Sequence, residues 1–183
     1  MTPAPVLARI ADLCLEFSLP EASGRQFEAI LEALAADHAP TAVSGPAEGV
    51  DVHIADSLSA LPLLDRDREL RIADLGSGCG IPGLVLASAL PLAHVYEVDS
   101  QRKRGEFVAE AAAAAGIANV ETVWGRAEEW QAGSGSCDVA VARALADLPV
   151  VLEYAAPLLK PGGLMIAWKG RLDGGELERG AAA

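Results

Sequence analysis

The sequence predicts an α/β protein in which a doubly wound, mostly parallel sheet follows a helical extension. Three observations predict this class. From residue 71 onward, short apolar segments alternate with helix-like segments, which is typical of a parallel sheet covered by helices. A glycine-rich turn, "GSGCGIPG", directly follows the first apolar segment. The residues before that segment have their apolar positions at helical spacing. The 183 residues suit one domain, and we expect 1–64 to be the extension, 65–172 the ligand-binding α/β core and 173–183 a tail.

The extension is expected to contain two helices. Residues 18–37 carry one apolar stripe, and Ser18 and Glu21 have the spacing of a capping box at the start of that helix. Residues 38–50 are rich in proline, glycine and alanine and are expected to form a loop. Residues 51–64 are expected to be helical again, with apolar positions at i, i+4 and i+7. These positions are Ile54, Leu58 and Leu61.

The core is expected to alternate strands and helices. "LRIADL" predicts a buried strand, and Pro82 opens a helix that runs to about Leu90. "HVYEV" predicts a strand that ends at Asp99, and the helix after it is closed by Gly116. The remaining elements are the strands "VETVWG" and "CDVAVARA", the helix "LPVVLEYAAPLL" and the strand "GGLMIAWKG".

Composition excludes several classes of protein. No apolar run approaches the roughly 18 residues of a membrane span, and the N-terminus lacks the basic region of a signal peptide. Three cysteines without a C-x-x-C spacing, Cys14, Cys79 and Cys137, indicate free thiols in a reducing cytoplasm. A net charge of −12 argues against a general binder of polyanions. Basic residues that could still form a local basic face are Arg102, Lys103, Arg104, Lys169 and Arg171.

The glycine-rich turn supports two interpretations. The spacing Gly78-x-Gly80-x-x-Gly83 matches the fingerprint of dinucleotide-binding proteins, which favours an NAD-dependent oxidoreductase. The expected strand, however, ends at Leu75, so the turn starts one residue later. The pattern then becomes Asp74-x-Gly76-x-Gly78-x-Gly80, which is typical of S-adenosylmethionine sites. In either case glycine permits both the tight turn and the close approach of a ligand.

Asp99 closes the second expected strand. An ionised carboxylate at this place can accept two hydrogen bonds from a ribose diol, and its charge suits a cationic sulfonium ligand. The alternative is an acid at a strand end that pairs with Arg102 or Lys103.

His53, Asp56 and Ser57 share one face of the expected helix, at i, i+3 and i+4. They cannot form a Ser-His-Asp triad, because that geometry draws on separate elements. The face is either solvated or part of a binding pocket. No cluster of cysteine or glutamate lies near His53 in the sequence, so no metal site is expected.

Six segments occur in a recognisable order: "HIADSL", "DLGSGCGIPG", "VDSQRKR", "RAEE", "ARA" and "WKG". On these segments the chain resembles the 16S ribosomal RNA (guanine-N7) methyltransferases, also called glucose-inhibited division protein B, over about residues 13–172. The resemblance implies a class I, Rossmann-like S-adenosylmethionine-dependent methyltransferase fold. It also implies S-adenosylmethionine as cofactor and 16S ribosomal RNA, or the small ribosomal subunit, as partner.

The resemblance further implies roles for single residues. Asp99 would hold the cofactor's ribose, and Arg143, at the end of the fourth strand, would lie at its methyl end. The helix face that carries His53 would form part of the pocket for the target base. The glycine-turn residues against the cofactor would be Gly76, Gly78 and Ile81, and the pair flanking the adenine would be Ala127 and Glu128. The positioning candidates are His53, Asp56, Arg143 and Lys169.

The chain departs from the family pattern in two places. Before "HIADSL" the family has W-N-x-x-x-N-L-T, and this chain has "DHAPTAV", which keeps only Thr41. The family continues past the Lys-Gly element into two more strands, whereas this chain ends at "GGELERGAAA". Those strands are therefore expected to be absent, and "LMIAWKG" to be an uncovered edge of the sheet.

The chemistry of the expected acceptor fits what the sequence lacks. Guanine N7 carries a free lone pair, so its methylation requires no general base. The sequence has neither the D/N/S-P-P-Y/F element of exocyclic-amine methylation nor the Pro-Cys nucleophile of pyrimidine C5 methylation. A small-molecule methyltransferase on the same fold, an NAD-dependent oxidoreductase and a cofactor-binding module without catalysis stay open as alternatives. We expect a monomeric cytoplasmic protein.

Overall fold

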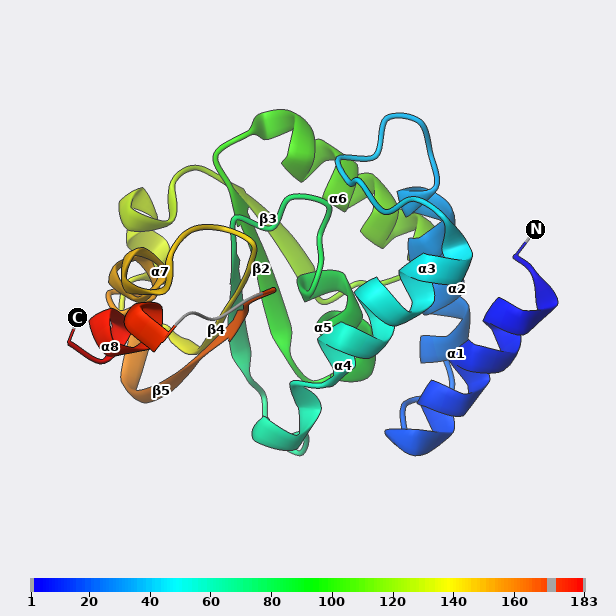
Figure 1. Ribbon diagram of the computed structural model, residues 1–183, viewed down its shortest axis with the longest axis horizontal. Helices are drawn as coiled ribbons and strands as arrows, with labels where there is room; N and C mark the ends of the chain where they lie inside the picture. The colour runs from blue at the N-terminus through cyan, green and yellow to red at the C-terminus, as the bar shows by residue number, and fades with distance from the viewer. Residues whose placement is uncertain (1, 171–173, 183) are drawn as a thin grey trace.

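The computed structural model describes residues 2–170 and 174–182, and its centre is a sheet of five parallel strands (Figure 1). The strands are β1 (Arg71–Leu75), β2 (His94–Asp99), β3 (Val120–Trp124), β4 (Cys137–Arg143) and β5 (Leu159–Trp168). Their order is β3-β2-β1-β4-β5, so the chain moves outward from β1 to β3 and then returns to the other side of β1. This is the doubly wound sheet that the alternation of segments predicts.

Helices cover both faces of the sheet. The first face carries α5 (Gly83–Ala89) and α6 (Arg102–Ala115), and the second carries α7 (Leu148–Ala155), with α8 (Gly174–Ala182) against α7. Alternate strand residues enter two hydrophobic clusters: Ile72 and Val95 join the cluster around α5, and Ala73 and Tyr96 join the one around α7. Burial on both faces explains why the strands are nearly continuous apolar runs.

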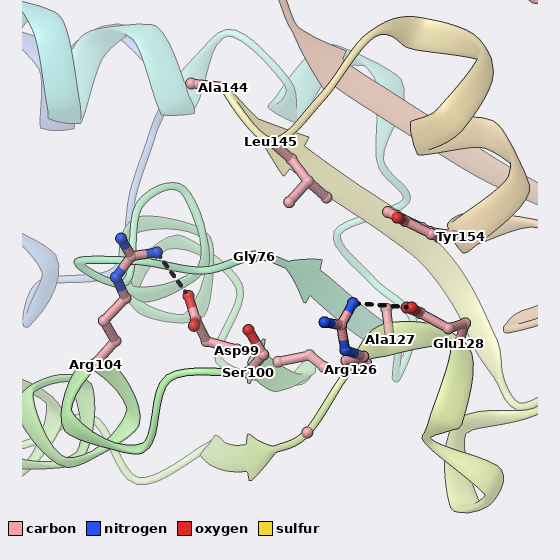
Figure 2. A pocket seen from close by; sticks show the side chains of 12 residues that line it. Gly76, Asp99, Ser100, Arg104, Arg126, Ala127, Glu128, Ala144, Leu145 and Tyr154 are labelled. Carbon is pink, nitrogen blue, oxygen red and sulfur yellow. Dashed lines mark hydrogen bonds and ion pairs between the residues drawn. The ribbon is translucent and has the colours of Figure 1, made fainter.

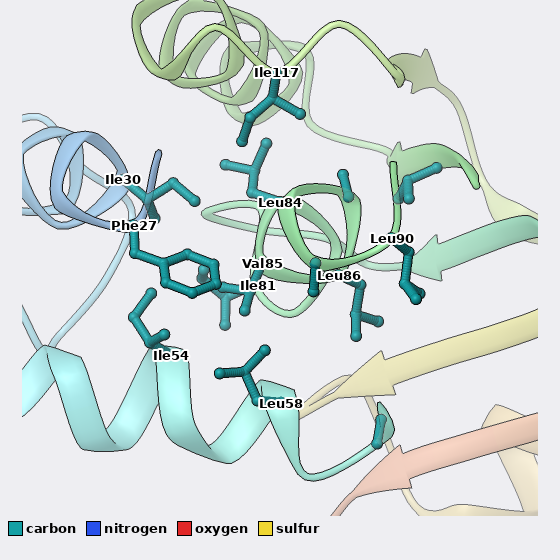
Figure 3. Close-up of a cluster of buried hydrophobic side chains, with 14 of the residues drawn as sticks. Phe27, Ile30, Ile54, Leu58, Ile81, Leu84, Val85, Leu86, Leu90 and Ile117 are labelled. Atoms are coloured by element: carbon teal, nitrogen blue, oxygen red, sulfur yellow. The ribbon is translucent and has the colours of Figure 1, made fainter. Parts of the chain in front are cut away.

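The N-terminal extension packs on the first face and shares its hydrophobic cluster. Its elements are α1 (Ala4–Glu16), α2 (Ser23–Leu34), α3 (Pro46–Gly49), a π-helical turn η1 (Val50–Ala55), α4 (Asp56–Leu58) and a 3₁₀ turn η2 (Leu61–Leu63). Phe27 of α2 and Ile54 of η1 lie against α5, which is buried along its whole length (Figure 3). Burial of such a side chain stabilises the fold by about 1.5–3 kcal/mol, so the extension holds α5, and with it the glycine turn, in place.

The helix boundaries in the extension differ from the sequence-based expectation. The expected helix at 18–37 starts only at Ser23, and the predicted capping box is wrong, because the N-cap is Ala22 and makes no side-chain hydrogen bond. The Arg66 guanidinium instead donates to the carbonyl oxygens of Phe17 and Ser18, at 2.6 and 3.0 Å. This long-range contact fixes the chain between α1 and α2 in a non-helical conformation.

The expected helix at 51–64 is also modified. It begins as a π-helical turn and ends at Leu58, and Pro62, which lacks an N–H donor, lies in the 3₁₀ turn that follows. Ile54, Leu58 and Leu61 are nevertheless all buried, at 0, 0 and 3% exposure, as their spacing predicts.

Toward the end of the chain most expectations are confirmed. Gly116 closes α6 in the left-handed region, with φ +67°. β5 lies at the edge of the sheet among the described residues, and it starts at Leu159, earlier than "GGLMIAWKG". The segment expected as a tail carries α8, where Glu176 accepts a hydrogen bond of 2.8 Å from the backbone N–H of Leu148 at the start of α7.

Candidate active site

Two adjoining cavities open at the carboxyl ends of the strands, where the strand order reverses between β1 and β4. The first, of about 240 Å³, is bounded by Gly76 after β1, Asp99 at the end of β2 and Gly125 after β3. The second, of about 330 Å³, lies between the glycine turn and the extension. Gly76, Arg104 and Ala144 line both. Open α/β sheets bind ligands at this switch point.

Glycine occupies the positions of this turn for different structural reasons. Gly76, Gly78 and Gly80 all have positive φ, at +67°, +59° and +81°, a conformation that glycine adopts without strain. A Cβ on Gly80 would stand 2.7 Å from Leu84 Cδ1, and one on Gly83 would overlap Glu97 Oε1, so the protein's own packing excludes side chains there. A Cβ on Gly78 would meet only Gly76 O, at 3.7 Å. Of these glycines, Gly78 is therefore the one with space for a ligand beside it.

Asp99 ties the glycine turn to the end of β2. Its Oδ2 accepts a hydrogen bond of 3.0 Å from Gly78 N–H, and its Oδ1 accepts one of 2.8 Å from Gln101 N–H. Arg104 Nη1 also donates to Oδ2, at the longer distance of 3.4 Å (Figure 2). A carboxylate offers about four lone-pair sites, so Asp99 holds the turn and retains acceptor capacity toward the first cavity.

The alternative that Asp99 pairs with Arg102 or Lys103 is wrong, because its partner is Arg104. Arg102 instead bonds Glu106, one turn further along α6, at 2.9 Å, and lies over the ring of Trp124. Arg102 and Lys103 are exposed at the start of α6, while Arg104 points back into both cavities.

The far wall of the first cavity comes from two other elements (Figure 2). Ala127 and Glu128 lie on the 3₁₀ turn η3 (Ala127–Glu129), and both line the cavity. Leu145 and Tyr154 also line this cavity, and Leu145 points toward Gly76. Sequence reasoning did not find these two residues, because they belong to the segment between β4 and the end of α7 and carry no motif.

Ala144 is a further residue that sequence reasoning missed as an element of the site. It follows β4 directly and has φ +52°, the left-handed region that a residue with a Cβ rarely adopts. Such strain concentrates at functional sites. The signal could not be read from the sequence, since alanine carries no preference for this conformation.

The second cavity brings four of the remaining candidates together. Gly78 and Ile81 line one side, and His53 and Arg143 line another. Arg143 Nη1 donates to Val52 O at 2.8 Å and lies 3.5 Å from Asp56 Oδ2, so it connects the end of β4 to the extension. The loop in which the family motif is not kept also contributes, because Thr41 and Val43 line this cavity.

The helix face of His53, Asp56 and Ser57 is only partly as expected. Ser57 is fully buried and donates to His53 O at 2.6 Å, so it does not face the cavity; the π-helical turn changes the angular spacing that the i, i+4 pattern assumes. His53 Nε2 lies 2.9 Å from Val43 O. Burial, and then the positive charge of Arg143, lower the pKa of His53, whereas the hydrogen bond to Val43 raises it. His53 is therefore a neutral imidazole that holds the loop.

Lys169 lies apart from the cavities. Its Nζ donates to Ala146 O at 2.8 Å and pairs with Glu176 Oε1 at 2.6 Å, an arrangement that fixes α8 beside the start of α7. The candidate Arg171 lies outside the described residues. Of the expected basic face, Arg102, Arg104 and Lys169 are thus each paired with an acid of the chain.

The three cysteines are not joined by a disulfide. Cys14, Cys79 and Cys137 are free thiols. Burial raises the pKa of Cys79, the cysteine of the glycine turn, to about 11, so it is not a thiolate nucleophile. Among residues 2–170 and 174–182, no group of three or more His, Cys, Asp and Glu side chains could hold a metal ion. In the same residues no helix is long and apolar enough to cross a bilayer.

The fold is shared with solved methyltransferase structures. The chain superimposes on an S-adenosylmethionine-dependent O-methyltransferase from Thermotoga maritima with a TM-score of 0.59 and 18% identity, covering 70% of this chain and 48% of that one. For an S-adenosylmethionine-dependent methyltransferase from Aquifex aeolicus the TM-score is 0.55 at 19% identity, covering 69% and 70%. The protein therefore has the class I methyltransferase fold, with an N-terminal helical extension.

Curated relatives found by sequence have a higher identity to the chain than these solved structures. The chain is 44% identical over 134 residues to a ribosomal RNA small subunit methyltransferase G of Deinococcus radiodurans, covering 72% of this chain and 53% of that protein. It is 38% identical over 146 residues to the protein of the same name from Moorella thermoacetica, covering 78% and 60%. The chain thus spans between about half and two thirds of the length of these curated relatives. The model of the family "GidB: rRNA small subunit methyltransferase G" matches residues 22–183, and the chain belongs to that family.

Proposed function

We propose that this chain binds S-adenosylmethionine and transfers its methyl group to N7 of a guanine in 16S ribosomal RNA. The observation that carries the cofactor assignment is the open space beside Gly78, next to Asp99, at the switch point of the sheet. The acceptor assignment rests on membership of the family and on relatives named as small-subunit ribosomal RNA methyltransferases. We place this activity in the cytoplasm, in a monomer.

The residues of the two cavities fit this cofactor. Asp99 would hold the ribose, and the Arg104 contact, the longest of the three that Asp99 accepts, is the one that a ribose hydroxyl would replace most easily. Ala127 and Glu128 would flank the adenine in the first cavity. Gly78 and Ile81 would lie along the methionine part in the second cavity, whose volume is in the range of small-molecule sites.

The polar groups of the second cavity suit an acceptor that needs no deprotonation. When bound, S-adenosylmethionine supplies a methyl group on a positively charged sulfur, which a free lone pair can attack directly. Among the described residues that line this cavity there is no carboxylate, and the His53 imidazole is engaged with Val43 O. The chain would then act by orientation, with Arg143 at the boundary between the cofactor and the acceptor. Orientation alone can supply about 7–11 kcal/mol of the barrier.

The charge of the chain bears on how RNA would be recognised. A net charge of −12 opposes non-specific binding to RNA. Recognition would therefore depend on an unstacked guanine that enters the second cavity and on the shape of the surrounding RNA. The acidic surface would penalise incorrect RNA. It also makes a small-molecule acceptor on the same cofactor site the second candidate function.

Two measurements test the proposal. Calorimetry with S-adenosylhomocysteine and with NAD should show binding of the first alone, and binding of NAD alone would contradict the cofactor assignment. Labelled methyl transfer to small ribosomal subunits and to free 16S RNA, followed by borohydride and aniline cleavage, should locate the methyl group at one guanine. Cofactor binding together with transfer only to small molecules would replace the RNA assignment by the small-molecule one.

A further inference from the structure

Two acidic side chains lie together in the core beneath the glycine turn. Asp74 of β1 and Glu97 of β2 are paired in the parallel register, and they are 1% and 0% exposed. A Cβ on Gly83, the first residue of α5, would overlap Glu97 Oε1 and stand 2.8 Å from Asp74 Oδ2. The two carboxyl groups therefore converge on the first turn of α5, directly after the turn that lines both cavities.

The surroundings distinguish the two acids. Asp74 Oδ2 accepts a hydrogen bond of 2.7 Å from Gly83 N–H, which stabilises a carboxylate. Glu97 accepts no hydrogen bond of ordinary geometry from the described residues, although the hydroxyl of Ser77 and the carboxyl of Asp74 are its polar neighbours. Two adjacent carboxyl groups in such a core cannot both be charged. The group without an N–H donor is the one that keeps a proton.

The other charges near Asp74 and Glu97 do not allow both carboxyl groups to be ionised together. Asp99, at the end of β2, disfavours a charge on Asp74, and Arg143, at the end of β4, favours one. Cys79 of the turn stays a neutral thiol beside both acids. Burial is the main cause that raises the pKa of Asp74, to about 7, and that raises the pKa of Glu97 well above its ordinary value.

We propose that Glu97 is protonated and donates its hydrogen to Asp74, and that this carboxyl–carboxylate pair positions residues 76–82 for cofactor binding. Asp74 precedes the turn and Gly83 follows it, so the pair fixes both ends of the segment that carries Gly78. Glu97 touches no ligand in this arrangement and acts through Asp74 as a positioning residue. The positioning role depends on the proposed use of S-adenosylmethionine, whereas the shared proton does not.

The proposal fixes the sign of a pH dependence. The folded chain binds a proton that the unfolded chain, whose aspartate and glutamate titrate near 3.8 and 4.5, releases. Stability contributed by the pair is therefore present at low pH and falls as the pH rises through the titration of the folded pair. Above that titration two buried charges face each other, and the turn should loosen at the same pH.

The first test is the melting temperature without ligand, from about pH 6 to about pH 10, for the wild type, E97Q and the matched control E110Q. The amide introduced by E97Q can still donate to Asp74 but has no proton to lose, and Glu110 is exposed on α6. Melting of the wild type and of E110Q should fall with rising pH, and melting of E97Q should change less. The same pH dependence in the wild type and E97Q would overturn the shared proton. If E97Q does not fold, D74N provides the second variant: it removes the negative charge that raises the pKa of Glu97, so the fall in melting temperature should move to lower pH. An unchanged wild-type pH profile in D74N would overturn the shared proton.

The second test is calorimetry with S-adenosylhomocysteine over the same pH range. The dissociation constant of the wild type and of E110Q should rise about tenfold per pH unit above the titration of the pair, and that of E97Q should stay constant. If the melting temperature of E97Q depends less on pH while its affinity for S-adenosylhomocysteine keeps the wild-type pH dependence, the positioning role is overturned. A wild type that binds no S-adenosylhomocysteine at neutral pH would refute the proposed cofactor and with it the positioning role, and the melting curves would still decide the shared proton.

Discussion

Replacing Gly78 by leucine should abolish cofactor binding while the chain still folds. A Cβ at this position would meet only Gly76 O, at 3.7 Å, so the side chain has room and enters the second cavity. Because φ is +59°, an L-residue costs about 1–2 kcal/mol there. For a chain of this size that cost lowers the melting temperature by about 2–4 °C per kcal/mol. Calorimetry with S-adenosylhomocysteine should then detect no binding.

Gly116 provides a control that matches the strain without the site. It closes α6 with φ +67°, and a Cβ there would have nothing within 4 Å. Gly116→Leu should therefore lose similar stability and bind S-adenosylhomocysteine like the wild type. Wild-type affinity in Gly78→Leu would refute the placement of the cofactor on the turn. Loss of binding in both variants would mean that backbone strain, not occupation of the cavity, is responsible.

Three further predictions are tested by calorimetry, by unfolding and by RNA binding. Asp99→Asn should weaken binding of S-adenosylhomocysteine by about 10- to 150-fold, the scale of 1.5–3 kcal/mol for hydrogen bonds to a charged group. The control Asp138→Asn, at the opposite end of the sheet, should lower only the melting temperature. Equal loss of affinity in both variants would contradict the role of Asp99. Ala144→Gly should keep its stability within about 1 kcal/mol, because it removes strain at φ +52°, and a larger loss in denaturant unfolding would show that no strain is stored there. Joint replacement of Arg102 and Lys103 by glutamine should flatten the salt dependence of binding to small-subunit RNA, and an unaltered slope would assign both to the solvated surface.

Local periodicity was sufficient to predict most of the fold. The alternating strands and the glycine that closes α6 depend on residues close in sequence, and the structure places them as expected. The start of α2 was not predictable in this way. Arg66, nearly fifty residues further along the chain, donates hydrogen bonds to the carbonyl oxygens of Phe17 and Ser18, which precede α2. The π-helical turn at Val50–Ala55 likewise has no local pattern that distinguishes it from an ordinary α-helix.

The candidate site was predictable only where it lies on a motif. The glycine turn and Asp99 fall at the ends of β1 and β2, so a parallel sheet must bring them together. Tyr154 reaches the same cavity from α7, and nothing in its neighbourhood in sequence indicates this. The alternative interpretation of Asp99, an ion pair with Arg102 or Lys103, named the wrong cations because three consecutive basic residues begin α6 and only Arg104 is directed toward the cavity.

The glycine pattern combines two physical requirements that the sequence cannot separate. Gly83 is required by the buried acids, because any Cβ would enter the space of Asp74 and Glu97. Among the described residues, no packing contact requires glycine at position 78; only its positive φ favours glycine there, and it borders the second cavity. The shifted match to the dinucleotide fingerprint shares Gly78 with this pattern and ends at Gly83, where the close packing is also what the third glycine of that fingerprint provides, so the glycines alone do not separate the two kinds of ligand. The pattern that starts at Asp74 includes Gly78 and also contains the acid that holds the next helix. Its spacing therefore reflects the support of the turn as much as the contact with a cofactor.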